Sequence, residues 1–417
     1  MELVDLEVED QTFYDQVARC FEAIKKAEDR SEHIGRIQLT LFTPIRRIHE
    51  SFCDLLRYPS WRVHLLSPEQ LPKLNSVQGL SICNAENPRG LRICNAESYS
   101  DLAYSKIDLR MIVHLAARCP NLRYLGCKIG IDEWAATDED YRHIGDNRKE
   151  FASAVYNTKL PSSLRYIQLN FMNKAEDRMN EQRKQLPDLV YPAPFDLFSL
   201  SLRLLSYQLR KMEIRVMADE TLFWPHSNDS HTSSNFWPNL ESLNAMFSVA
   251  MPSGSWYFKG PLGEGRDTKG YRIRDEDNGD GSVIECLCGT SEQAASGTRR
   301  MFRVTPFDET INPFLEAFAN AAANMPKLWE ALIWTPLDFS PEGTTDSDDE
   351  HEEVSEHGQR YLSRRLSSYD LTAISQYPDT ELAWGIAYIA PGGAPFDIGE
   401  PNCPSRQFWW RVVLDEV

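Results

Sequence analysis

The sequence lacks the features that mark exported and membrane-spanning proteins. Its first ten residues, Met1–Asp10, are rich in acids, whereas a secretory signal begins with basic residues followed by an apolar core. No uninterrupted apolar run approaches the roughly 18 residues that a helix needs to cross a bilayer. We therefore expect a soluble protein of the cytoplasm or nucleus that does not bind membranes.

Two further patterns are absent. The nine cysteines are odd in number and include no repeated Cys-x-x-Cys pair, so neither a disulfide framework nor a structural zinc site is expected. Positive charge is scarce, because 44 Lys and Arg stand against 62 Asp and Glu, for a formal net charge of −18. This charge would repel a phosphate backbone, so nucleic acid is not an expected partner.

The motifs of the common catalytic sites are missing as well. There is no Gly-x-Ser-x-Gly elbow, no His-Glu-x-x-His and no assignable nucleophile triad. We therefore predict no catalytic residues and no bound cofactor. The sequence favours a protein that is not an enzyme, but it leaves that question open.

Two loops carry metal-binding residue types in unsuitable patterns. Asp275–Gly281 is similar to a calcium loop, but with Gly281 at the sixth position the twelfth is Leu287, which has no carboxylate to offer. His226 and His231 lie in a Ser- and Asn-rich loop, where no helix orients the two rings. We predict no metal site in either loop.

What the sequence does contain is a repeated apolar pattern. The 417 residues, 42% of them hydrophobic, are enough for two or three domains or for one elongated array. The pattern apolar-x-x-apolar-x-apolar recurs with its central residues 45, 42, 45, 31 and 88 residues apart, which indicates repeated structural units. The triplets are Val77/Leu80/Ile82, Leu122/Leu125/Cys127, Leu164/Ile167/Leu169, Leu209/Met212/Ile214, Leu240/Leu243/Ala245 and Leu328/Ala331/Ile333.

A helical pattern precedes three of these triplets. Each helical face is followed by a proline or a polar break and then by the strand pattern. One helix and one strand cannot bury their own apolar surfaces, whereas stacked units share a continuous core. The sequence therefore predicts an α/β solenoid in which the triplets are neighbouring strands. The helical faces are Leu109/Ile112/Leu115/Ala116/Cys119, Phe195/Phe198/Leu202/Leu205/Leu209 and Phe314/Phe318/Ala321/Ala322/Met325.

Composition along the chain predicts four regions. The first contains a helix over 11–29 and a strand over 36–41, and the last ends in strands over 382–389 and 408–413. Residues 340–360 have almost no apolar content and many acids, which predicts a disordered loop. The regions are an N-terminal helix and strand segment (1–70), the array (71–250), a β-rich insertion (251–305), and a final repeat with a C-terminal cap (306–417).

Several short motifs span roughly residues 110–410, and their order is more specific than any one of them. They are Cys119–Leu125, Leu160–Ile167, Leu222–Pro225, Phe236–Leu243, Pro252–Phe258, Met325–Leu332 and Trp384–Tyr388. Together they resemble fungal F-box-like proteins with irregular leucine-rich repeats.

The resemblance implies a leucine-rich-repeat fold and a role in binding other proteins. It also implies an adaptor that presents targets to a ubiquitin ligase, with no catalytic residues. The F-box itself is not recognisable, because this three-helix module usually opens with a Leu-Pro pair, and the first such pair is Leu71-Pro72. The N-terminal region is therefore interpreted as either a cap of the array or a degenerate F-box.

The repeat also predicts a binding surface. Strand residues that flank the central apolar residue point away from the core, because successive strand positions face opposite sides of a sheet. These residues form a mixed aromatic, amide and charged row, which suits recognition of another protein. The predicted partner-binding residues are Tyr124, Tyr166, Gln168, Lys211, Glu213, Ser242 and Asn244.

Two other functions stay open at this point. One is an accessory enzyme or small-molecule binder of a fungal pathway, with a pocket between the array and region 251–305. The other is a structural remnant of an F-box protein that makes no contact with a ligase. A deep cavity with convergent polar groups would favour the first of these.

Overall fold

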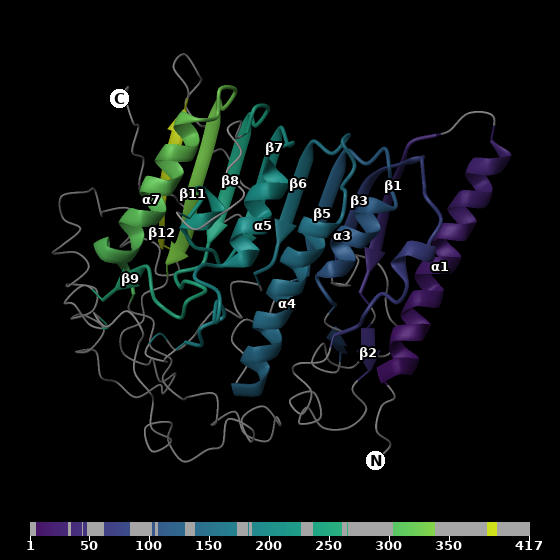
Figure 1. The fold of residues 1–417 in the computed structure, drawn as a ribbon, viewed down its shortest axis with the longest axis horizontal. Helices are drawn as coiled ribbons and strands as arrows, with labels where there is room; N and C mark the ends of the chain where they lie inside the picture. The colour runs from purple at the N-terminus through teal and green to yellow at the C-terminus, as the bar shows by residue number, and fades with distance from the viewer. Residues whose placement is uncertain are drawn as a thin grey trace, which may run out of the picture.

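The centre of the fold is an eight-stranded sheet (Figure 1). The computed structural model describes residues 6–31, 35–43, 45–47, 62–83, 102–104, 107–129, 138–172, 182, 186–226, 237–260, 265, 303–337 and 382–389. The sheet order is β1 (Ile37–Phe42), β3 (Val77–Cys83), β5 (Tyr124–Lys128), β6 (Tyr166–Asn170), β7 (Lys211–Val216), β8 (Ser242–Phe247), β11 (Glu330–Leu337) and β12 (Leu382–Ile389). All neighbours are parallel except β11 and β12, so the sheet grows in one direction as the chain proceeds.

Helices cover one face of this sheet. Figure 1 shows α3, α4, α5 and α7 side by side in front of the strands, with α1 beyond β1 at one end. The fold is therefore mixed α/β with a mostly parallel sheet, in line with the predicted class. The described helices are α1 (Leu6–Arg30), α3 (Arg110–Ala117), α4 (Asp138–Asn157), α5 (Leu197–Ser206) and α7 (Asp308–Ala323), with short 3-10 turns η1 (Pro68–Gln70) and η4 (Glu220–Leu222).

The second and third residues of the six apolar triplets lie side by side in the sheet, as predicted, and the first residue of every triplet except Val77 precedes its strand. Their central residues are register partners from β3 to β11, and so are their third residues. All of them are buried beneath the helices. The two rows are Leu80, Leu125, Ile167, Met212, Leu243 and Ala331, and Ile82, Cys127, Leu169, Ile214, Ala245 and Ile333.

The predicted helical faces coincide with α3, α5 and α7. Their apolar residues are buried against the sheet, apart from the half-buried Phe195, which precedes α5, and Ala322. Helix α4 was not predicted. Its apolar side is narrow and centres on Phe151, Ala154 and Val155, while acidic and basic residues dominate the rest of the helix.

The N-terminal helix belongs to the same core. Phe13, Val17 and Phe21 of α1 are buried. The Glu28 carboxylate accepts hydrogen bonds from the Ser76 backbone N–H at 2.6 Å and from its hydroxyl at 2.5 Å. Because β1 pairs with β3, the sheet runs across the predicted boundary at residue 70. Helix α1 closes this end of the core.

The C-terminal strand predicted over 382–389 is present as β12. Two small antiparallel pairs flank the main sheet: β2 (Ile45–Arg47) with β4 (Leu102–Tyr104), and β9 (Phe258–Lys259) with β10 (Thr305–Pro306). The pair β9 and β10 joins the two ends of the predicted insertion. The strand predicted over 408–413, the loop over 340–360 and most of the insertion lie outside the described residues.

Candidate functional site

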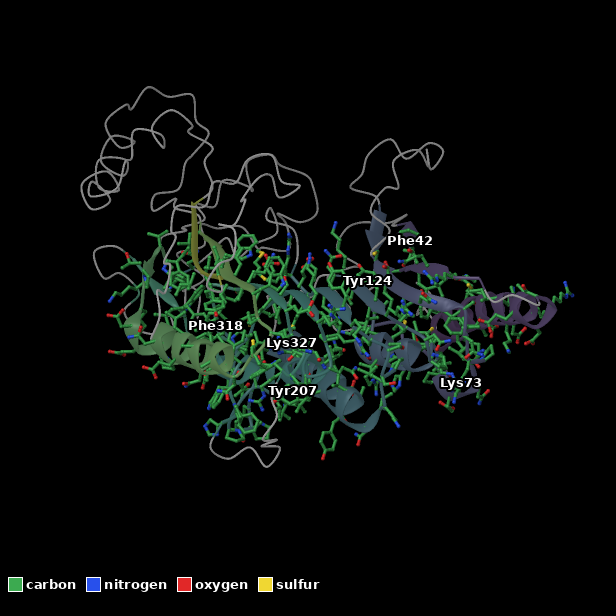
Figure 2. The ribbon with its side chains drawn as sticks, turned by 90° about the horizontal axis from the view of Figure 1, so that it is seen from above. Phe42, Lys73, Tyr124, Tyr207, Phe318 and Lys327 are labelled. Carbon is green, nitrogen blue, oxygen red and sulfur yellow. The ribbon has the colours of Figure 1, made fainter. Side chains whose placement is uncertain are left out.

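The candidate site is the face of the sheet opposite the helices, called the outer face below. Figure 2 shows Tyr124 and Phe42 on this side, and Tyr207, which follows α5, on the other. Strand register brings the predicted residues together in two adjacent rows. The first row is Tyr124, Tyr166, Lys211 and Ser242, and the second is Gln168, Glu213 and Asn244.

Polar side chains of the outer face form a connected network across three strands. The Tyr124 hydroxyl donates to Oε1 of Gln168 at 3.0 Å. The Gln168 amide then donates to Oε2 of Glu213 at 2.9 Å, and Oε1 of Glu213 lies 2.8 Å from Nζ of Lys211. Each side chain is held by its neighbour, so the surface has a defined shape before any partner binds.

The two tyrosines of the first row pack against each other. Their ring centroids are 5.0 Å apart at 54°, and Nζ of Lys211 lies 5.3 Å from the centre of the Tyr166 ring. Partial burial raises the pKa of Tyr166, and its hydrogen bond to Glu213 raises that pKa further. Partial burial also raises the pKa of Tyr124, although a hydrogen bond to Ser81 opposes the shift. Both phenols are therefore neutral donors near pH 7.

Gly126 is part of this arrangement, and the sequence reasoning missed it. It occupies the second row in β5, between Ser81 and Gln168. A Cβ atom at this position would lie 2.6 Å from the Tyr124 hydroxyl and 3.0 Å from Oγ of Ser81. The missing side chain leaves room for the Tyr124 hydroxyl to reach Gln168. The sequence does carry a signal for it, because this glycine occupies a position at which the neighbouring repeats have outward-facing polar residues.

The β8 end of the predicted surface is less accessible than expected. Ser242 is only 6% exposed, and its hydroxyl donates to Oε1 of Glu330 at 2.5 Å. Asn244 is half-buried and accepts a hydrogen bond from the Trp334 indole at 3.0 Å. Both partners belong to β11, so the accessible part of the outer face is centred on β5, β6 and β7.

A third row at the carboxyl ends of the strands was also missed. Register places Lys128, Asn170 and Arg215 side by side on β5, β6 and β7. Lys128 and Arg215 are exposed, and Asn170 is half-buried. These residues lie one strand step beyond the triplets, so the apolar pattern did not single them out.

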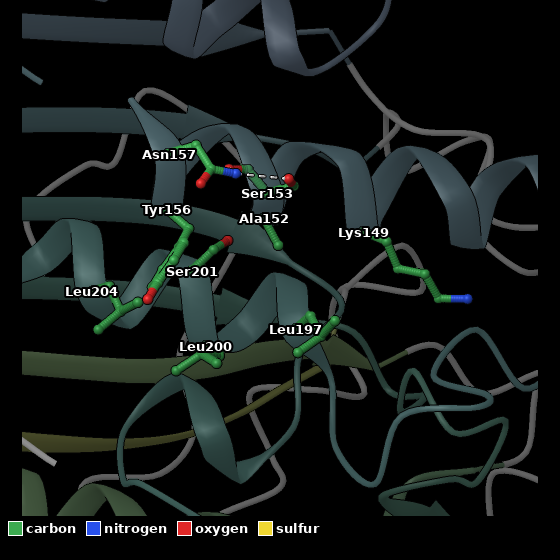
Figure 3. Close-up of a pocket in the computed structure, with 9 residues that line it drawn as sticks. All are labelled: Lys149, Ala152, Ser153, Tyr156, Asn157, Leu197, Leu200, Ser201 and Leu204. Atoms are coloured by element: carbon green, nitrogen blue, oxygen red, sulfur yellow. Dashed lines mark hydrogen bonds between the residues drawn. The ribbon is translucent and has the colours of Figure 1, made fainter. Parts of the chain in front are cut away.

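A shallow groove lies on the opposite side of the molecule, between α4 and α5 (Figure 3). It has a volume of about 230 Å³ and is lined by Lys149, Ala152, Ser153, Tyr156, Asn157, Leu197, Leu200, Ser201 and Leu204. Its Asn157 amide donates to the Ser153 carbonyl at 2.9 Å, and Nζ of Lys149 donates to the Tyr191 carbonyl at 2.7 Å. These polar groups donate hydrogen bonds to backbone carbonyls and do not converge on the groove. The groove therefore offers no evident catalytic arrangement.

A buried polar cluster joins α4, α5 and η4. Nη2 of Arg148 lies 2.6 Å from the carboxylate of Asp196, which caps α5 by accepting from two of its N–H groups. Asp219 caps η4 and accepts from the Asp196 N–H at 2.9 Å. Burial, followed by repulsion from Asp196, raises the pKa of Asp219 to about 7. Because Arg148 and Asp196 are almost fully buried, this cluster fixes the loop geometry rather than meeting a substrate.

The predicted loops with metal-binding residue types are only partly visible. His226 packs against Phe195 with ring centroids 5.2 Å apart, whereas His231 and residues 275–281 lie outside the described residues. Within the described part of the chain, no three His, Cys, Asp or Glu side chains cluster as metal ligands. No helix in those same residues combines the length and apolar character needed to cross a bilayer.

No protein-family model, curated protein or solved structure matches this chain. Membership of the F-box-like family therefore stays a prediction from the sequence. The role of the chain has to be inferred from its own geometry, above all from the outer face of β5 to β7.

Proposed function

We propose that this protein is a leucine-rich-repeat-like scaffold that binds another protein through the outer face of β5, β6 and β7. The observation that carries the proposal is the network of Tyr124, Gln168, Glu213 and Lys211 on adjacent strands. A surface whose side chains are already ordered loses little conformational entropy on binding. Tyrosine, of which Tyr124 and Tyr166 are half-buried examples in and beside this network, is enriched where proteins meet.

The order of the strands supports the solenoid part of the proposal. Successive units contribute one strand each to neighbouring positions in the sheet, and their apolar rows align without a break from β3 to β11. In a solenoid each repeat packs mainly on its neighbours, and the accumulated strand faces form an extended binding surface. The outer face is formed in this way, by the exposed side of successive strands.

The finer role as a ubiquitin-ligase adaptor rests on the resemblance to fungal F-box-like proteins. The described residues before β3 form one long helix, two strands and a 3-10 turn, and both α1 and β1 pack into the array. This packing favours a cap of the repeats over a degenerate F-box for the α1 to β1 region.

Co-purification from a fungal lysate tests the proposal. The informative variant is Tyr124→Ala with Tyr166→Ala, and the matched control is Tyr156→Ala with Tyr191→Ala, two tyrosines that are 60% and 74% exposed. We expect wild type and control to capture the same partner and the outer-face variant to lose it at unchanged thermal stability. Ligase subunits among the captured proteins would support the adaptor role.

Three other results would argue against the proposed surface. Undiminished capture by the outer-face variant would overturn the proposed surface. Loss of the partner in the control alone would instead point to the α4 and α5 groove, because Tyr156 lines it. A large loss of thermal stability in the outer-face variant would show that the two tyrosines serve the core.

A further inference from the structure

The chain enters several strands of the sheet through an arginine. The residue immediately before β1, β5, β6 and β7 is in each case an exposed arginine: Arg36, Arg123, Arg165 and Arg210. The Arg165 N–H donates to the Arg123 carbonyl at 3.0 Å, and the Arg210 N–H donates to the Arg165 carbonyl at 2.8 Å. Neighbouring strands are about 4.8 Å apart, so the last three arginines form a close row. Figure 2 views the molecule from this edge of the sheet, which is uppermost in Figure 1.

This edge, called the amino edge below, is basic although the chain is acidic. The segments that lead into β3, β5, β6 and β7 are residues 67–76, 118–123, 158–165 and 207–210, and they contain six Lys or Arg but a single acid, Glu69. The whole chain, by contrast, has 44 Lys and Arg against 62 acids. The amino edge therefore has a local field opposite in sign to the net charge. Its six cations are Lys73, Arg118, Arg123, Lys159, Arg165 and Arg210.

Much of this positive charge is unpaired within the described part of the chain. Four exposed side chains at this edge make neither a hydrogen bond nor an ion pair with the described residues: Arg36, Lys73, Arg123 and Lys159. Arg118 differs, because it is half-buried and donates to a backbone carbonyl. The exposed cations are therefore available to an external anion.

The other two arginines of the row are held in place by neighbouring groups. Nη1 of Arg165 donates to the Ser162 and Leu164 carbonyls at 2.6 and 2.8 Å. These acceptors are neutral, so they fix the guanidinium and leave its charge uncompensated. Arg210 donates to both carboxylate oxygens of Glu241, at 2.9 and 3.0 Å. The uncompensated part of the row is therefore centred on Arg123 and Arg165.

Helix stabilisation does not account for these two arginines. A cation near the C-terminus of a helix stabilises it, but the effect falls off within the last turn. Arg123 lies six residues beyond the end of α3, and Arg165 lies eight residues beyond the end of α4. Both are exposed, so they do not serve the core either. A role in recognising an anion explains their position.

An acidic protein segment matches the row better than a larger polyanion does. A guanidinium binds a carboxylate through two parallel N–H donors. From Arg36 to Arg210 the row crosses four strand spacings, or about 19 Å, which is the length of about six extended residues. The unpaired charge ends at Arg210, where Glu241 begins to neutralise it. A nucleic acid or an anionic membrane would extend past the row and meet the repulsion of an acidic protein.

The row adjoins the outer face, because Arg123 and Arg165 directly precede Tyr124 and Tyr166. We propose that the amino edge binds an extended acidic segment of the partner protein, an inference that rests on the proposed binding through the outer face. Carboxylates of this segment pair with the Arg123 and Arg165 guanidiniums, while the adjoining part of the partner contacts the outer face. Charge complementarity of this kind sets orientation and accelerates association.

Selection of random dodecapeptides displayed on phage, against the full chain, tests this inference. We expect the selected peptides to include a group rich in Asp and Glu that binds more weakly as salt increases. Arg123→Glu with Arg165→Glu should lower the affinity of these peptides about tenfold or more. The matched control is Arg19→Glu with Lys26→Glu, two exposed cations of α1, which makes the same change in net charge and should bind like wild type. Arg123→Glu alone removes no hydrogen bond to the described residues, so it repeats the test if the double variant unfolds.

The arginine variant reports on the amino edge and the tyrosine variant on the outer face, so this inference and the proposed function can fail separately. Selected peptides without acidic residues that require Tyr124 and Tyr166 would overturn the acidic segment and leave the outer face intact. Acidic peptides that bind the arginine variant as well as wild type would also overturn it. Tighter binding of single-stranded DNA, or of vesicles with equal parts phosphatidylcholine and phosphatidylserine, than of any acidic peptide would overturn the assignment to a protein segment.

Discussion

The two faces of the sheet are made by alternate residues of the same strands, yet different forces stabilise them. Toward the helices, Leu125, Ile167 and Met212 are register partners and at most 3% exposed. One residue along, Gly126, Gln168 and Glu213 are also register partners, and hydrogen bonds link the latter two to Tyr124 and Lys211. Burial of apolar surface stabilises the first face. The second face is held by exposed polar interactions, each of which adds little net stability.

This difference separates stability from recognition within each repeat. A substitution on the helix side should act on folding, and one on the outer face should act on binding. The four predictions below test that separation.

Ile167→Asp should have the largest effect. It would place a carboxylate in a fully buried site, at a cost of several kcal/mol that approaches the whole stability of a typical domain. Gln168→Asp, one residue along on the outer face, should leave the fold intact. Circular dichroism and urea unfolding of the two variants measure the contrast, and equal tolerance would show that the faces are not distinct.

Arg148→Leu should have the second-largest effect on the free energy of unfolding. The ion pair with Asp196 is buried on the helix side, and removal of one partner of such a pair typically costs about 3–5 kcal/mol. Lys149→Leu at the neighbouring, partly exposed position should change the unfolding free energy by less than about 1 kcal/mol. Urea titrations compare the two variants. Similar small values for both would mean that the buried cluster is dispensable.

A smaller effect should appear as pH dependence. Burial raises the pKa of Asp219 to about 7 from its ordinary 3.8, so the folded state holds this proton at pH values where the unfolded chain has lost it. Its contribution to stability is complete below about pH 3.8 and declines as pH rises to about 7. The difference in unfolding free energy between wild type and Asp219→Asn should therefore fall across this window. A difference that rises with pH would contradict the assignment.

Gly126→Ala should have the smallest effect on stability. The new methyl group would displace the Tyr124 hydroxyl, which is the end of a movable side chain, and Ala is favoured over Gly in a strand. We expect a net change below about 1 kcal/mol, because the lost hydrogen bond is partly exposed. Partner capture should nevertheless weaken, since Tyr124 no longer orients Gln168. Full retention of binding would argue against a preordered surface.

The rows of the sheet were predictable because they depend on a local pattern. Leu125 and Ile167 sit at the centre of triplets whose period sets which strands become neighbours. The same alternation placed Tyr124 and Gln168 on the opposite face. Both placements depend only on each triplet forming a strand and on successive units stacking.

Other features depend on residues far apart in the chain. Ser242 is covered by Glu330, which lies 88 residues later, and Arg148 meets Asp196 across 48 residues. No short-range pattern in the sequence predicts such pairs. Helix α4 was missed for a different reason, since its charged residues obscure a narrow apolar side. Lys128 and Arg215 lie beyond the triplets, so their gathering on one face became visible only through the register.

The reversal of β12 relative to β11 ends the parallel series among the described strands. A second copy that continued the array end to end would bring its β1 to β12 and pair with it in the antiparallel sense, so strand direction alone would not prevent fibre growth. Helix α1 lies beyond β1 at that end (Figure 1), and a helix that covers an edge strand is a common protection against such pairing.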